Sequence, residues 1–167
     1  MSNENPYLPP QAELSSENSH NDSQLAGRGQ RLGAAIIDGI IGAAMAVPII
    51  LLLGTWNYIK AGSQPPLSLV FFGGVLGFAA FLLVHGHFLN TYGQTVGKRL
   101  IGIRIVNLAG ELPGLQKLIV ARYLPITAVS MIPFVGSILN FVDVLFIFRA
   151  DRRCVHDLIA GTRVEIC

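Results

Sequence analysis

Four charged side chains interrupt the apolar stretches of the sequence, at Arg31, Asp38, Arg122 and Asp143. A charge near the centre of a bilayer costs about 2.5–3.5 kcal/mol on insertion scales, so each of these side chains is expected to face a partner or water. An aspartate can take up a proton when it loses its solvent, whereas an arginine stays charged. The set could therefore bind a cation, relay a proton or neutralise itself as a static network, and we expect Arg122 to be the partner of Asp38.

A basic, glycine-rich segment is the second candidate site. It reads GQTVGKR at residues 93–99 and contains Gln94, Gly97, Lys98 and Arg99. Three residues rather than four separate its glycines, and Arg99 stands where a phosphate-binding loop needs Ser or Thr to hold magnesium. Backbone flexibility and contact of the basic side chains with lipid headgroups therefore explain the segment better than nucleotide binding does.

The histidines and cysteines do not predict a metal site. His85 and His87 are two residues apart, so on a helix they point to nearly opposite sides. Cys154 and His156 lack the paired spacing of zinc sites, and no nucleophile with an adjacent base stands out. We predict no catalytic residue, no metal, no cofactor and no enzymatic activity.

Composition indicates the surroundings in which these groups lie. Hydrophobic residues make up 51% of the 167 residues, charged residues 13%, and the mean hydropathy is +0.54, whereas soluble domains carry about 25% charged residues. So little charge cannot cover a globular surface, which predicts an integral membrane protein with the lipid bilayer as its partner. The net charge of +2 is small, and no basic face with interleaved aromatic residues indicates binding to nucleic acid.

The apolar runs predict an all-α membrane protein, a bundle of about four transmembrane or membrane-embedded helices. Their expected ranges are 31–53, 67–89, 115–132 and 135–149. As one helix, the last two segments would be about 51 Å long, which exceeds a hydrocarbon core of about 30 Å. Pro133 and Gly136 indicate the break between them.

Two short segments outside these helices alternate like strands, at residues 101–106 and 162–166. We expect them to pair as a small cytoplasmic two-stranded sheet that needs the helices or headgroups for support. Residues 1–27 are rich in Pro, Ser, Asn and Glu and are expected to form a disordered tail. This leaves residues 28–167 as the membrane domain.

The distribution of Lys and Arg predicts the orientation. Residues 90–117 carry basic side chains, and so does the region after residue 148, whereas Lys60 alone lies between the first two apolar runs. Cytoplasmic segments carry the excess of Lys and Arg, so four crossings with cytoplasmic N- and C-termini fit better than three.

Three separated motifs resemble the RDD family of bacterial membrane proteins, which is named for one arginine and two aspartates. They are Arg31-Leu32 with Asp38, the segment 93–99, and HDLIAGTRV at residues 156–164. By this resemblance the family arginine is Arg31 and its first aspartate is Asp38. The second aspartate is Asp143, with Asp157 as the alternative. The resemblance implies a small multi-pass protein of the bacterial inner membrane over about residues 28–166, and for some members transport of ions or small ligands, including sodium–proton antiport.

Two functions remain open at this stage. In the first, the chain transports a small cation or ligand with proton coupling through Asp38 and Asp143, and it forms a homo-oligomer because one protomer offers few walls for a pathway. In the second, it is a non-catalytic scaffold or accessory subunit in which the Arg/Asp network is structural. An enzyme acting on lipid headgroups near His156 ranks last, because no nucleophile–base pair supports it.

Overall fold

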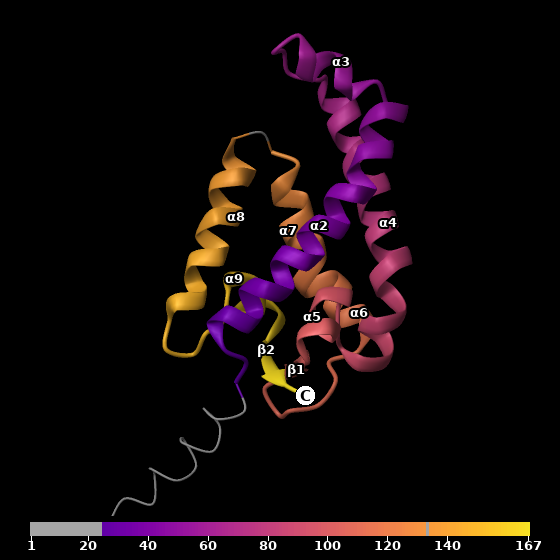
Figure 1. Ribbon diagram of the computed structural model, residues 1–167. Helices are drawn as coiled ribbons and strands as arrows, with labels where there is room; N and C mark the ends of the chain where they lie inside the picture. Colours follow the sequence, from indigo (N-terminus) through magenta and orange to yellow (C-terminus); the bar gives the residue numbers. More distant parts are fainter. Residues whose placement is uncertain (1–24, 133) are drawn as a thin grey trace, which may run out of the picture.

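Two long antiparallel helices dominate the fold. The computed structural model describes residues 25–132 and 134–167, so most of the predicted tail lies outside the described residues. Helix α2 (Arg28–Leu52) and helix α4 (Leu67–Tyr92) lie side by side, and the short helix α3 (Thr55–Lys60) connects them at one end (Figure 1). The segment between the first two predicted apolar helices thus contains a helical turn and a half that the sequence did not indicate.

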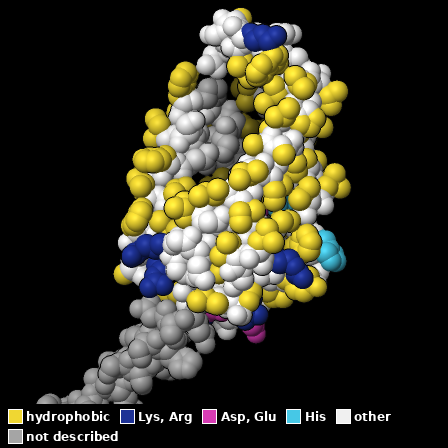
Figure 2. Space-filling view, viewed as in Figure 1, with side chains coloured by type: hydrophobic (Ala, Val, Ile, Leu, Met, Phe, Trp, Pro, Cys, Tyr) yellow, Lys and Arg dark blue, Asp and Glu magenta, His cyan; other side chains and the backbone are white. Residues whose placement is uncertain are grey.

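Helices α2 and α4 are long and apolar enough to cross a membrane. With 25 and 26 residues they reach about 37–39 Å at about 1.5 Å per residue, against a hydrocarbon core of about 30 Å. Their outer faces are apolar, and Leu52 and Leu83 are each 85% exposed. Hydrophobic side chains cover much of the surface along these helices (Figure 2). Such a surface suits lipid and not water.

A shorter helical hairpin packs beside the long pair. Its first arm runs through α6 (Leu115–Lys117), the π-helix η1 (Leu118–Tyr123) and α7 (Leu124–Ser130), and its second through α8 (Val135–Leu145) and the 3₁₀ turn η2 (Phe146–Phe148). These arms of 16 and 14 residues reach only about 21–24 Å. The helices and the break near residue 133 are therefore as predicted, but four transmembrane helices are not established.

The π-helical turn has a local cause. Pro125 has no N–H to donate to the carbonyl of Ala121, so the backbone around these residues cannot follow a regular α-helical ladder. The wider turn of η1 takes up the mismatch. Arg122 lies within this turn and is buried.

The opposite end from α3 holds a small sheet and two short helices. Strand β1 (Ile103–Asn107) pairs antiparallel with β2 (Thr162–Ile166), from Ile103 opposite Ile166 to Asn107 opposite Thr162. The prediction of a two-stranded sheet is confirmed. Helix α5 (Val96–Ile101) precedes β1 and α9 (Val155–Ala160) precedes β2.

Two boundaries differ from the prediction. Ile101 ends α5 and does not begin the strand. Residues 25–27 belong to the folded unit and not to the tail, because Leu25 bridges to Glu165 and the Ala26 N–H donates to the Val164 carbonyl at 2.9 Å. A β-bridge needs a partner distant in sequence, which local composition cannot reveal.

The buried core lies at this sheet end, not midway along the long helices. It is formed by apolar side chains from α2, α4, the sheet and η1, namely Ala34, Leu89, Ile103, Ile105, Leu118 and Val164. Helix α5 packs closely against α2. The short elements thus form a cap under the long helices, and we call this region the polar end.

Candidate functional site: a buried charge network

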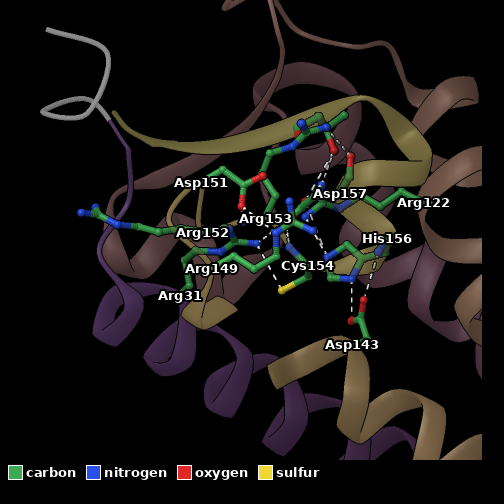
Figure 3. A network of polar contacts seen from close by, with 11 residues as sticks. Arg31, Arg122, Asp143, Arg149, Asp151, Arg152, Arg153, Cys154, His156 and Asp157 are labelled. Atoms are coloured by element: carbon green, nitrogen blue, oxygen red, sulfur yellow. Dashed lines mark hydrogen bonds and ion pairs between the residues drawn. The ribbon is translucent and has the colours of Figure 1, made fainter. Parts of the chain in front are cut away.

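Asp157 is the centre of the network at the polar end. It lies in the first turn of α9 and is fully buried, and Arg31 and Arg122 each form an ion pair with one of its two carboxylate oxygens (Figure 3). The Cys154 N–H donates to Asp157 Oδ2 at 3.0 Å. Both oxygens are therefore saturated by donors from three segments that are far apart in sequence.

The expected pairing of Arg122 with Asp38 is wrong. The side chain of Arg122 points into the polar end, where it meets Asp157, donates to Thr162 Oγ1 at 2.6 Å and lies 3.2 Å from His156 Nε2. The π-turn of η1 packs against α9, and this sets the direction of the guanidinium. Helix spacing alone could not reveal that contact.

Electrostatics match this geometry. Burial alone would raise the pKa of Asp157, but the guanidinium groups of Arg122 and Arg31 hold that pKa well below its usual range. Asp157 therefore stays ionised at neutral pH. Its two arginine partners make it a fixed anion, not a group that exchanges protons.

Asp38 has a different role, because it caps the N-terminus of α5. Its Oδ1 accepts the Gly97 N–H at 2.7 Å and its Oδ2 accepts the Thr95 hydroxyl at 2.5 Å. The Lys98 N–H is held by Thr95 Oγ1 at 3.3 Å, and the Val96 N–H by His85 Nδ1 at 3.2 Å. Three free N–H groups of α5 are thus satisfied, two of them by side chains of the long helices.

Glycine at position 97 permits this contact. A Cβ placed there would lie 2.3 Å from the Ala34 carbonyl oxygen and 2.8 Å from Asp38 Oδ1. The backbones of α5 and α2 can approach this closely only without a side chain. Gln94 in the same segment donates from Nε2 to the Ile103 carbonyl at 3.0 Å, which ties the segment to β1. The glycine-rich segment therefore allows α5 to pack closely against α2 and to contact Asp38.

Asp143 and His156 form a second pair. Asp143 Oδ1 accepts the His156 N–H at 3.0 Å, and Oδ2 lies 2.7 Å from Nδ1 of the same residue. Arg122 approaches the other ring nitrogen, so the contacts assign the proton to Nδ1 and leave Nε2 as the acceptor. Burial and the charge of Arg122 lower the pKa of His156, which supports the neutral ring.

Asp143, Cys154 and His156 place three ligand-type atoms within 4.8 Å of one another. The sequence did not suggest this grouping. The site suits a metal ion poorly, because His156 already occupies both oxygens of Asp143 and the Arg31 guanidinium lies 3.7 Å from Cys154 Sγ. Burial raises the pKa of the Cys154 thiol to about 11, so the thiolate that a metal needs is disfavoured.

The structure thus divides the predicted site residues into groups. One network contains five of them: Arg31, Arg122, Asp143, His156 and Asp157. Asp38 lies outside this network and accepts a hydrogen bond from the Gly97 N–H. Arg99 stacks on the outside against Tyr92, with its guanidinium carbon 4.3 Å from the ring centre. Gln94 is hydrogen-bonded to the carbonyl of Ile103 in β1, and Lys98 lines a small pocket beside the network.

Sequence reasoning missed three contributors: Thr95, Cys154 and Thr162. Thr95 precedes a helix and could have been predicted as its N-cap. Thr162 is fully buried between Arg122 and Asp157. No local signal marks that position, because the contact comes from the turn between α9 and β2.

These features define a class: a small, mainly helical protein with two membrane-length apolar helices and a buried Arg/Asp network where they end. The chain matches the model of the RDD family over residues 25–161, and it belongs to that family. The resemblance seen in the motifs is confirmed.

Relatives carry no assigned activity. The chain is 34% identical over 136 residues, 80% of each chain, to "Uncharacterized protein YckC" of Bacillus subtilis. It is 30% identical over 94 residues, covering 56% of this chain and 58% of the relative, to "Uncharacterized protein" of Haemophilus influenzae. No solved structure matches.

Proposed function

We propose that the chain is a multi-pass protein of the bacterial inner membrane that acts as a non-catalytic scaffold or accessory subunit, with a structural Arg/Asp network. The observation that carries this proposal is the saturation of Asp38 and Asp157. Each carboxylate has both oxygens bonded to protein donors, so neither offers a free oxygen to a travelling cation.

Charge placement supports cytoplasmic termini. All 12 Lys and Arg residues lie within the described ranges, and Lys60 alone belongs to α3, at the far end of the long helices. The positive-inside rule then puts the polar end, with β2 near the C-terminus, at the cytoplasmic face. Both arms of the hairpin meet that end, so it enters the bilayer from the cytoplasmic side and returns to it.

Transport is the second candidate, and one observation favours it. Asp143 and His156 form a carboxylate–imidazole pair beside a small pocket that Lys98 also lines. Such a pair could exchange a proton with a bound cation or ligand. One protomer supplies few walls for a pathway, so this function needs a homo-oligomer.

Coupled substitutions separate the two functions. Asp38→Ala and Thr95→Val each remove part of the α5 cap, and each is expected to destabilise the purified protein by about 1–3 kcal/mol. If the contact is structural, the double variant loses less stability than the sum of the two single variants. Asp151→Ala, at an exposed ion pair with Arg149, is the control and should have little effect.

Proteoliposomes supply the opposing result. The scaffold proposal expects no sodium-driven pH change above that of empty vesicles. A clear signal from the wild type that disappears in a well-folded Asp143→Asn variant would overturn the proposal in favour of antiport.

A further inference from the structure

A pocket of about 110 Å³ lies beside the charge network, between α2, α5, η1 and α8. Its inner wall is charged and its mouth is apolar. The side chains of Arg31, Lys98 and Arg122 line the inner wall together with Asp143 and His156. Three formal positive charges thus face one negative charge.

The negative charge at the wall is already engaged. His156 bonds both oxygens of Asp143, and the two arginines are held by Asp157 from behind. They are therefore fixed positive charges. Lys98 Nζ differs, because it has no hydrogen-bond or ion-pair partner among residues 25–132 and 134–167. Burial, reinforced by Arg122, lowers the pKa of Lys98 to about 8, and the more distant charges of Asp38 and Asp157 only partly oppose this shift.

The mouth of the pocket opens on the apolar outer surface of the helices. Leu32 of α2 is 52% exposed and Val144 of α8 is 49% exposed, and both line the pocket. Arg31 lies in the first turn of a membrane-length helix, which is the depth of the headgroup layer. A molecule that enters here would meet apolar side chains outside and cationic side chains inside.

We propose that this pocket binds the phosphate group of an anionic membrane phospholipid, with Lys98 as the ammonium that contacts it and Arg31 and Arg122 as fixed charges behind it. The acyl chains would lie against Leu32 and Val144. This inference rests on the proposed placement of the polar end at the cytoplasmic face, where anionic lipids and basic pockets meet. Guanidinium and ammonium groups both bind phosphate strongly when water is excluded.

Lipid titration of the purified protein in detergent tests the proposal. Short-chain phosphatidylglycerol should bind the wild type more tightly than short-chain phosphatidylcholine, followed by thermal shift and by native mass spectrometry. Lys98→Gln should weaken phosphatidylglycerol binding about tenfold, as expected for loss of one charged contact. Lys117→Gln removes the same charge from an exposed position at the same end, and should change binding by less than about twofold.

A second variant covers misfolding of Lys98→Gln. Val144→Trp changes an exposed side chain at the mouth, so it should fold and still block the lipid. Equal binding of the two phospholipids, or equal affinities in Lys98→Gln and Lys117→Gln, would overturn the proposal. Inorganic phosphate that competes at the affinity of the lipid would point to a soluble phosphate ligand and overturn the lipid source. These outcomes are independent of the Asp38–Thr95 coupling, so the scaffold proposal fails or stands separately.

Discussion

The long helices α2 and α4 and the polar end of this protein differ in the kind of contact that holds them together. Along the long helices the contacts are apolar, and between α2, α3 and α4 they leave a cavity of about 390 Å³ lined by residues such as Met45, Ile49 and Phe81. At the polar end the side chains are buried and specifically bonded, as Asp157 and Thr162 are. An apolar helix surface is stable in lipid in many arrangements, whereas a buried charge needs one particular counter-charge or hydrogen-bond partner.

This difference indicates where the fold is specified. Lipid tails are as apolar as leucine, so burying apolar side chains between membrane helices supplies little drive of its own. The partners of Arg31, Asp38, Arg122 and Asp157 instead select one arrangement, because a misplaced chain would leave a charge unpaired. Substitutions at the two ends should therefore differ sharply in effect.

The largest expected effect comes from Asp157→Ala. The variant leaves Arg31 and Arg122 buried without their shared anion, which should cost about 3–5 kcal/mol and abolish the monodisperse species on size exclusion. Asp157→Asn should be nearly as severe, since the amide keeps the shape but not the charge. A variant that unfolds thermally within a few degrees of the wild type would show that the network contributes little.

A matched pair of leucines on α4 sharpens the comparison. Leu89 is 2% exposed in the core of the polar end, and Leu89→Ala should lower the free energy of unfolding by about 2–5 kcal/mol. Leu83 faces outward on the same helix, and Leu83→Ala should stay within about 0.5 kcal/mol. Thermal unfolding in one detergent measures both. Equal losses would erase the distinction between the two halves.

Gly97→Ala should have an intermediate effect. The added methyl group meets the Ala34 carbonyl, so α5 must move away from α2, at about 1–3 kcal/mol. Gly86→Ala in α4 is the control, because a Cβ there meets nothing within 4 Å and alanine favours a helix. Thermal unfolding should therefore separate the variants, with Gly86→Ala at least as stable as the wild type.

Lys98 should also make the stability of the protein depend on pH. Burial, with Arg122 and Arg31, lowers its pKa to about 8 against the favourable charges of Asp38 and Asp157. Between about pH 8 and its ordinary value near 10.5 the unfolded chain holds a proton that the folded chain has lost, so stability rises with pH in this window, by at most about 1.4 kcal/mol per unit. In lipid-free detergent, Lys98→Gln should flatten this rise. Parallel curves for variant and wild type would contradict the assignment.

Prediction from sequence succeeded where the signal was local. Apolar runs located α2, α4 and both arms of the hairpin, and alternation located the two strands. It failed where the signal was distant. The sequence favours Asp38 as the partner of Arg122 because both are charges in apolar runs, but the partner of Arg122 is Asp157, which lies in a short helix outside those runs. Asp157 is 126 positions from Arg31 and 35 positions from Arg122 along the chain. Both ion pairs therefore depend on tertiary contact, which neither composition nor periodicity encodes.

The sequence by itself determined that this chain is mainly helical, suited to lipid, and a member of the RDD family, because hydropathy, periodicity and short motifs are properties of neighbouring residues. Only the tertiary structure decided which charges neutralise one another, that Asp38 caps α5, and that Lys98 lines a pocket with no ion-pair partner in the described part of the chain. The physical reason is that charge pairing depends on distances across the fold of a few ångströms, and those distances arise only when separate helices pack.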